Sequence, residues 1–257
     1  MKRLIGIRAI HQRNIQTAVL EAKRNGFGIL EIHLSSPQFL PQRYDPTDLK
    51  KVKVFAKKNN VILQTHSEIG QSLIQADAIL RKAEKQKLKQ IVQFSRRIGA
   101  RCLTLHIGDA PAYHFGIGKS IPNDVLYTDY YAELFRDSMK FITVIASKDL
   151  PVCIENDRLI PKYQNLLNGF LKTNKIFLTW DLMKTLRKDQ WKFFKKNIQY
   201  VRNIHVSSAG HDSLRGHEKD FTLFFNFLQA ESIPMVIEII PLKKAIETKN
   251  IIRKAGL

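Results

Sequence analysis

Six short apolar segments of the chain end in a histidine or an acidic residue, the side chain types that bind metal ions and transfer protons. The six residues are His66, His106, Glu155, Asp181, His205 and Glu238. An apolar, β-branched segment such as 151–154 is typical of a buried strand. A carboxylate there is almost never buried without a partner, because its desolvation is costly. Metal binding or catalysis is therefore favoured over an ion pair with Lys or Arg.

The histidines are weaker evidence when each is taken alone. A single histidine in a strand is more often a core residue than a ligand. His66 and His106, however, end two successive apolar segments, and two neighbouring imidazoles can hold one ion. If these histidines and the carboxylates meet in one apolar cup, their types predict a divalent metal site.

The elements that must bring these residues together alternate between strands and helices. About eight apolar segments alternate with helical patterns, which predicts a single-domain (β/α)₈ TIM barrel over residues 1–257. An open doubly wound sheet also alternates, but it does not explain polar residues at the ends of so many strands. The expected strands are 4–10, 28–34, 61–66, 102–107, 151–156, 176–181, 201–206 and 235–240. In a parallel barrel the carboxyl ends of all strands share one mouth.

Composition limits the class of protein without identifying the partner. Cys102 and Cys153 lie inside apolar segments, which predicts packing residues in a reducing compartment. There is no secretory signal and no apolar run near the ~18–20 residues that cross a bilayer, so we expect a soluble, cytoplasmic protein. A net charge of +19 suits polyanions or phosphorylated substrates, or simply lysine-rich solvated helix faces. Oligomeric state is left open.

The order of the six residues resembles the xylose isomerase-like TIM barrels, which include sugar isomerases, sugar epimerases and endonuclease IV. The resemblance extends over the whole chain. It implies that Glu155, Asp181, His205 and Glu238 hold a divalent metal ion. In endonuclease IV two further histidines join the first glutamate around a second zinc. By similarity, His66 and His106 would do so here, giving one or two ions of zinc, manganese or magnesium.

Two positions depart from endonuclease IV. Its third zinc uses a histidine three residues after the aspartate that corresponds to Asp181, where this chain has Lys184. It also uses an Asp-x-His motif that corresponds to Arg215-Gly216-His217. Two cations would repel a third metal. Lys184, Arg215 and His217 are instead predicted to contact an anionic group of the substrate, although surface charge explains Lys184 and Arg215 equally well.

The resemblance implies an isomerase or epimerase that acts on a sugar, a sugar phosphate or a related hydroxy-carbonyl compound through an enediolate. Glu155 and Glu238 would be the catalytic base and acid. An endonuclease IV-like phosphodiesterase acting on abasic DNA is the alternative, which makes nucleic acid a possible partner. A ligand-binding barrel without catalysis is the third. The stretch 107–122, rich in glycine and proline, could be a lid over the mouth.

Overall fold

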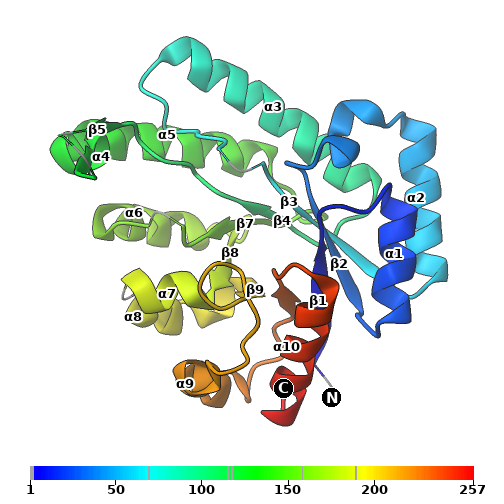
Figure 1. Ribbon diagram of the computed structural model, residues 1–257. Helices are drawn as coiled ribbons and strands as arrows, with labels where there is room; N and C mark the ends of the chain where they lie inside the picture. Colours follow the sequence, from blue (N-terminus) through cyan, green and yellow to red (C-terminus); the bar gives the residue numbers. More distant parts are fainter. Residues whose placement is uncertain (1–2, 69, 115, 117, 158, 189) are drawn as a thin grey trace.

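Eight parallel strands form a closed barrel, as the sequence predicts (Figure 1). The computed structural model describes residues 3–257 except 69, 115, 117, 158 and 189. Around the barrel the strand order is β1-β10-β9-β8-β7-β4-β3-β2, so the last strand closes onto the first. The barrel strands are β1 (Ile5–Ala9), β2 (Ile29–His33), β3 (Ile62–His66), β4 (Leu103–Leu105), β7 (Val152–Glu155), β8 (Ile176–Asp181), β9 (Val201–Val206) and β10 (Met235–Ile237).

Helices surround the barrel in chain order, and the longer ones pack an apolar face on it (Figure 1). Three of them begin after a residue whose side chain caps the first turn. Asn14, Asp45 and Asp77 each accept a hydrogen bond from a backbone N–H of the first turn. The α-helices are α1 (Ile15–Arg24), α2 (Pro46–Lys58), α3 (Ala78–Arg97), α4 (Asn123–Leu126), α5 (Thr128–Ile145), α6 (Pro161–Leu171), α7 (Leu182–Lys188), α8 (Trp191–Lys196), α9 (Glu218–Leu228) and α10 (Leu242–Lys254). Short 3₁₀ turns are η1 (Pro37–Phe39), η2 (Pro41–Arg43) and η3 (Ile198–Tyr200).

The stretch 107–122 contains two short antiparallel strands in addition to loop. They are β5 (Ala112–His114) and β6 (Ser120–Pro122), which pair with each other and not with the barrel. Residues 115 and 117, between them, lie outside the described residues. Three-residue strands with exposed side chains such as Tyr113 and His114 carry no clear alternation, which is why a sequence pattern does not reveal them.

The interior of the barrel is layered, because alternate residues of each strand point inward. Cys102, Cys153 and Phe177 form a small apolar cluster separate from the main core. Both cysteines are free and buried, in agreement with their predicted packing role. Above them, Thr104 of β4 and Thr179 of β8 hydrogen-bond at 2.8 Å across non-adjacent strands. Two residues further along, these strands reach the barrel mouth.

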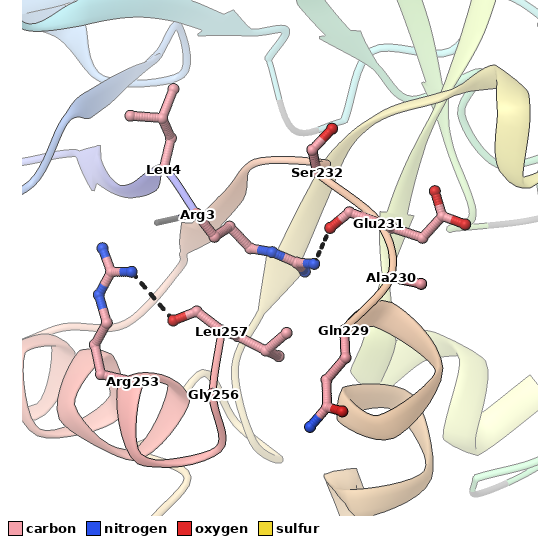
Figure 2. Close-up of a pocket in the computed structure, with 9 residues that line it drawn as sticks. All are labelled: Arg3, Leu4, Gln229, Ala230, Glu231, Ser232, Arg253, Gly256 and Leu257. Carbon is pink, nitrogen blue, oxygen red and sulfur yellow. Dashed lines mark hydrogen bonds between the residues drawn. The ribbon is translucent and has the colours of Figure 1, made fainter. Parts of the chain in front are cut away.

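The opposite end of the barrel, before the starts of β1 and β10, has a cavity of about 480 Å³ (Figure 2). Its two arginines are directed at backbone carbonyl oxygens. Arg3 donates to the carbonyls of Leu228 and Glu231, and Arg253 donates to that of Leu257 at 3.1 Å. These contacts tie the chain after α9 and α10 to the base of the barrel. Among the described residues, no helix combines the length and the apolar character that a bilayer crossing requires.

Candidate metal centre

All six predicted residues meet at the carboxyl-terminal mouth of the barrel. There, a cavity of about 410 Å³ is lined by His66, His106, Glu155 and Glu238. Asp181 and His205 lie beside them, and both are almost fully buried. Glu155, Asp181, His205 and Glu238 each offer a ligand atom within 4.8 Å of the others, and His66, His106 and Glu155 form a second such set. The geometry thus brings together the two groups that the resemblance implies.

One ring nitrogen of His205 faces the carboxylates of Glu155 and Glu238, and the other is held by Glu31. Its Nε2 lies 3.1 Å and 3.2 Å from the two oxygens of Glu31, so an Nε2–H donates to that carboxylate. Its Nδ1 lies 3.5 Å from Glu155 Oε2 and from Glu238 Oε2, and it has no hydrogen-bond partner within the described part of the chain. A buried nitrogen directed between two carboxylates is arranged as a metal ligand. The donor set therefore fits a divalent ion.

Glu155 is the most heavily contacted carboxylate of the centre. Its Oε2 lies 3.0 Å from His66 Nε2 and accepts a hydrogen bond from His106 Nε2 at 2.7 Å. Its Oε1 accepts a hydrogen bond from Lys184 Nζ at 2.5 Å. Burial alone would raise the pKa of Glu155, but Lys184, His106 and His205 hold it well below its usual value. Glu155 is therefore ionised at neutral pH.

The other acidic groups of the centre differ in their proton affinity. Burial, followed by the charge of Glu155, raises the pKa of Asp181 to about 6. For Glu238 burial acts in the same direction, but His205 and Arg8 outweigh it and lower the pKa to about 2. Arg8 lies 3.4 Å from Glu238 Oε1. Glu238 is thus held ionised, whereas Asp181 takes up a proton in mildly acidic solution.

The histidines of the centre respond to these carboxylates. Burial would lower the pKa of His205, but Glu238, Glu31 and Glu155 raise it well above its usual value. Glu155 likewise raises the pKa of His106 against the effect of burial. In the protein alone, protons on His205 and His106 offset part of the negative charge. A metal ion would have to displace them.

Two local features fix the positions of Glu155 and Asp181. The buried Asn156 donates to the backbone oxygen of Asp181 at 3.0 Å and accepts from the Asp181 N–H at 2.7 Å. This pair of bonds joins the ends of β7 and β8. Asp181 also accepts from the Lys184 N–H at 2.9 Å, and therefore caps α7, which begins at the next residue. Lys184 is brought over the barrel mouth by this first turn.

Of the three predicted substrate contacts, only Lys184 lines the mouth cavity. The side chain of Arg215 is 79% exposed and pairs with Glu247 of α10 at 3.1 Å. His217 precedes α9 and lies 3.3 Å from Asp220 on that helix. Neither Arg215 nor His217 is among the residues that line the cavity.

Three charged residues of this site, Glu31, Arg8 and Asp157, were not predicted from the sequence. Glu31 lies in the middle of β2, is fully buried, and accepts a hydrogen bond from Asn203 at 3.1 Å. Like Glu155, it is an acidic residue inside an apolar strand, and the same argument could have identified it. Arg8 in β1 gave a comparable signal. Asp157 follows Glu155 by two residues and lines the cavity, but nothing in its local pattern distinguishes it from a loop aspartate.

Fold and site together define a TIM barrel with a candidate metal centre at its mouth. Residues 19–255 match the sequence model of a family described as "Xylose isomerase-like TIM barrel". The chain belongs to this family. No match was found among curated proteins.

Solved structures of similar fold include several sugar epimerases. A 3-keto-D-glucoside 4-epimerase from E. coli superposes with a TM-score of 0.73 at 14% identity, over 99% of each chain. A D-allulose 3-epimerase from Methylomonas sp. gives 0.70 at 15% identity, over 99% of this chain and 98% of that one. A D-tagatose 3-epimerase-like protein gives 0.75 at 12% identity, over 98% and 97%. At these identities the likeness shows the shared fold.

Replacing Glu31 tests the anchoring of His205. In Glu31→Gln the charge that holds the Nε2–H is lost while the shape is kept, so Nδ1 is less well oriented and less basic. We expect Mn²⁺ to bind about 10–100-fold more weakly, as measured by calorimetry on chelator-treated protein. Glu133→Gln, on the exposed face of α5, makes the same charge change and should leave affinity unaltered. An unchanged affinity in Glu31→Gln, with the fold intact by circular dichroism, would contradict this role.

Metal binding should depend on pH in a defined direction. The raised pKa of Asp181, about 6 against an ordinary 3.8, stabilises the metal-free fold below 3.8, and that contribution is lost as pH rises through 6. The metal ion competes with the same proton. Mn²⁺ affinity and the gain in melting temperature on adding Mn²⁺ should both increase from about pH 5 to about pH 7. Calorimetry in two buffers of different ionisation enthalpy should show proton release; binding without proton release would contradict the assignment.

Proposed function

We propose that the protein is a divalent-metal-dependent isomerase or epimerase that acts on a sugar or a related hydroxy-carbonyl compound. The strongest support for this proposal is the placement of Glu155 and Glu238. Both line the cavity, and both lie 3.5 Å from the same nitrogen of His205, from strand ends on either side of it. Two ionised carboxylates flanking one metal ligand suit the transfer of a proton at a carbon beside a carbonyl group.

The chain's own residues would supply binding and proton transfer. A divalent ion held by Glu155, Asp181, His205 and Glu238 would polarise the substrate carbonyl and stabilise an enediolate. The low pKa values of Glu155 and Glu238 keep both able to accept a proton at neutral pH. One carboxylate would take the proton from the carbon. Transfer to the neighbouring carbon would return that same proton from the carboxylic acid so formed. Transfer to the opposite face would need the other carboxylate to take up a proton from solvent in the cavity first and then deliver it to the carbon, while the first group releases its proton to solvent. Arg8, bound to Glu238 Oε1, leaves Oε2 directed toward His205.

The cavity lining favours a substrate rich in hydroxyl groups. Gln71, Ser72 and Gln75, from the segment after β3, line it together with the charged groups. Gln71 is almost fully buried, and its Oε1 has no hydrogen-bond partner among the residues that the structure describes. That oxygen can accept a hydrogen bond from a substrate hydroxyl. A volume of about 410 Å³ lies in the range of small-molecule sites.

Charge in the cavity favours uncharged sugars over sugar phosphates. Among the described lining residues, the two side chains with permanent positive charge, Arg8 and Lys184, each already contact a carboxylate. Neither is spare for a phosphate group. We therefore place ketohexoses first among substrates, consistent with neighbouring structures solved with D-allulose and with D-tagatose.

A phosphodiesterase acting on abasic DNA is the second candidate. It is favoured by the two histidine contacts to Glu155 Oε2, at 3.0 Å from His66 and 2.7 Å from His106. Those three residues form a separate set of potential ligands and could hold a second ion. The net charge of +19 is also compatible with a DNA partner.

Isotope exchange tests the proposed reaction directly. Mn²⁺-loaded protein incubated in D₂O with D-fructose, D-tagatose or D-allulose should incorporate deuterium at a carbon beside the carbonyl and form the isomeric sugar. Glu155→Gln should lose at least about 10²-fold in rate, the low end of the usual contribution of a general base. It should keep its circular dichroism spectrum and melt cooperatively. Glu133→Gln is the matched control and should remain active. No exchange with any of these sugars by metal-loaded protein would count against the proposal.

An abasic-site duplex separates the two candidate functions. The epimerase proposal predicts no incision by the metal-loaded protein at substrate and protein concentrations that support sugar turnover. Incision that is removed by a chelator and by His106→Ala would reverse the ranking.

A further inference from the structure

The ammonium group of Lys184 lies among the oxygen atoms that would hold the metal ion. Its Nζ is 2.5 Å from Glu155 Oε1, 3.8 Å from Asp181 Oδ2 and 3.5 Å from Asp157 Oδ1. Glu155 and Asp181 belong to the four-residue ligand set. Lys184 therefore contacts half of that set directly, on the oxygen of Glu155 that the histidines do not use.

A divalent ion and this ammonium group cannot share Glu155 Oε1 and Asp181 without strong repulsion. Two like charges a few ångströms apart in a buried site repel far more than they would in water. For the ion to bind through both residues, Lys184 must leave. If Lys184 stays, the oxygens that it contacts on Glu155 and Asp181 are not available to the ion, and the ammonium charge lies next to the ion.

The side chain of Lys184 has space to move away from Glu155, whereas the side chain of Arg8 is more tightly enclosed beside Glu238. The Lys184 side chain is 21% exposed and lines the cavity beside Asp157, whose side chain is 35% exposed. A lysine stem is long and flexible, so the ammonium can move toward Asp157 and water at small cost. The side chain of Arg8, on strand β1, is only 10% exposed where it meets Glu238.

We propose that Lys184 is a displaceable counter-ion: it neutralises Glu155 when the metal ion is absent, and it moves onto Asp157 when the ion binds. The inference rests on the proposed metal centre, and it adds a role for Lys184. Once displaced, the ammonium remains at the cavity wall. Its charge is then balanced by Asp157, and one of its remaining N–H groups can donate a hydrogen bond to a substrate hydroxyl, so that ion binding prepares the substrate site.

Removing the Lys184 charge should tighten metal binding. In Lys184→Met the stem is kept but the competing ammonium is lost, and Glu155 Oε1 is left without its partner. We expect the Kd for Mn²⁺, measured by calorimetry on chelator-treated protein, to fall by about tenfold or more. Lys184→Arg keeps the charge and should bind no more tightly than the original protein. Lys162→Met is the control, because Lys162 pairs with Asp129 on the surface and makes the same change in net charge.

The outcomes separate this inference from the proposed centre. Equal or weaker binding in Lys184→Met, with Mn²⁺ still bound by the original protein, would overturn the role of Lys184 and leave the metal centre standing. Absence of Mn²⁺ binding in both proteins would overturn the metal centre and this inference with it.

A second measurement needs no variant and covers the case in which Lys184→Met does not fold. Lysine acetylation by a water-soluble reagent is followed by mass spectrometry, with Mn²⁺ and with chelator. Displacement of Lys184 from Glu155 predicts several-fold faster acetylation of Lys184 when Mn²⁺ is added, relative to Lys162 in the same sample. An unchanged or slower relative rate with Mn²⁺ would contradict displacement.

Discussion

Four carboxylates buried within one barrel mouth are the constraint on which the site depends. Glu31, Glu155, Asp181 and Glu238 are each no more than 3% exposed. Charges removed from water in this way must be balanced by cations or protons at short range. The chain supplies Arg8 and Lys184, and it raises the proton affinity of His205 and His106. A divalent ion at this centre would replace Lys184 and the histidine protons as the counter-charge.

The barrel explains why this concentration of charge is possible. Every second residue of a strand points into the barrel, and those at the carboxyl ends of the strands lie close together. Below them is the small apolar cluster of Cys102, Cys153 and Phe177. The bonds of Asn156 hold the ends of β7 and β8 in register. Glu31 supports His205 from the layer below. Rigid strands thus hold groups that would repel one another in a flexible chain.

The sequence predicted the fold and the six converging residues because both depend on strand periodicity. A histidine or carboxylate at the end of an apolar strand is visible in the pattern, and barrel closure then fixes where it lies. Three features depend on tertiary contacts and were not predictable in this way. Glu31 gains its role from His205, which is 174 residues away. Arg215 is turned toward Glu247 of α10. Lys184 was expected to meet a substrate anion, and its closest contact is instead Glu155.

Crystals grown with Mn²⁺ and measured at the manganese absorption edge test the central claim most directly. The account predicts an anomalous difference peak within bonding distance of Glu155, Asp181, Glu238 and the Nδ1 atom of His205. A map without a peak at the barrel mouth, with Lys184 still bound to Glu155 at a saturating Mn²⁺ concentration, would contradict it.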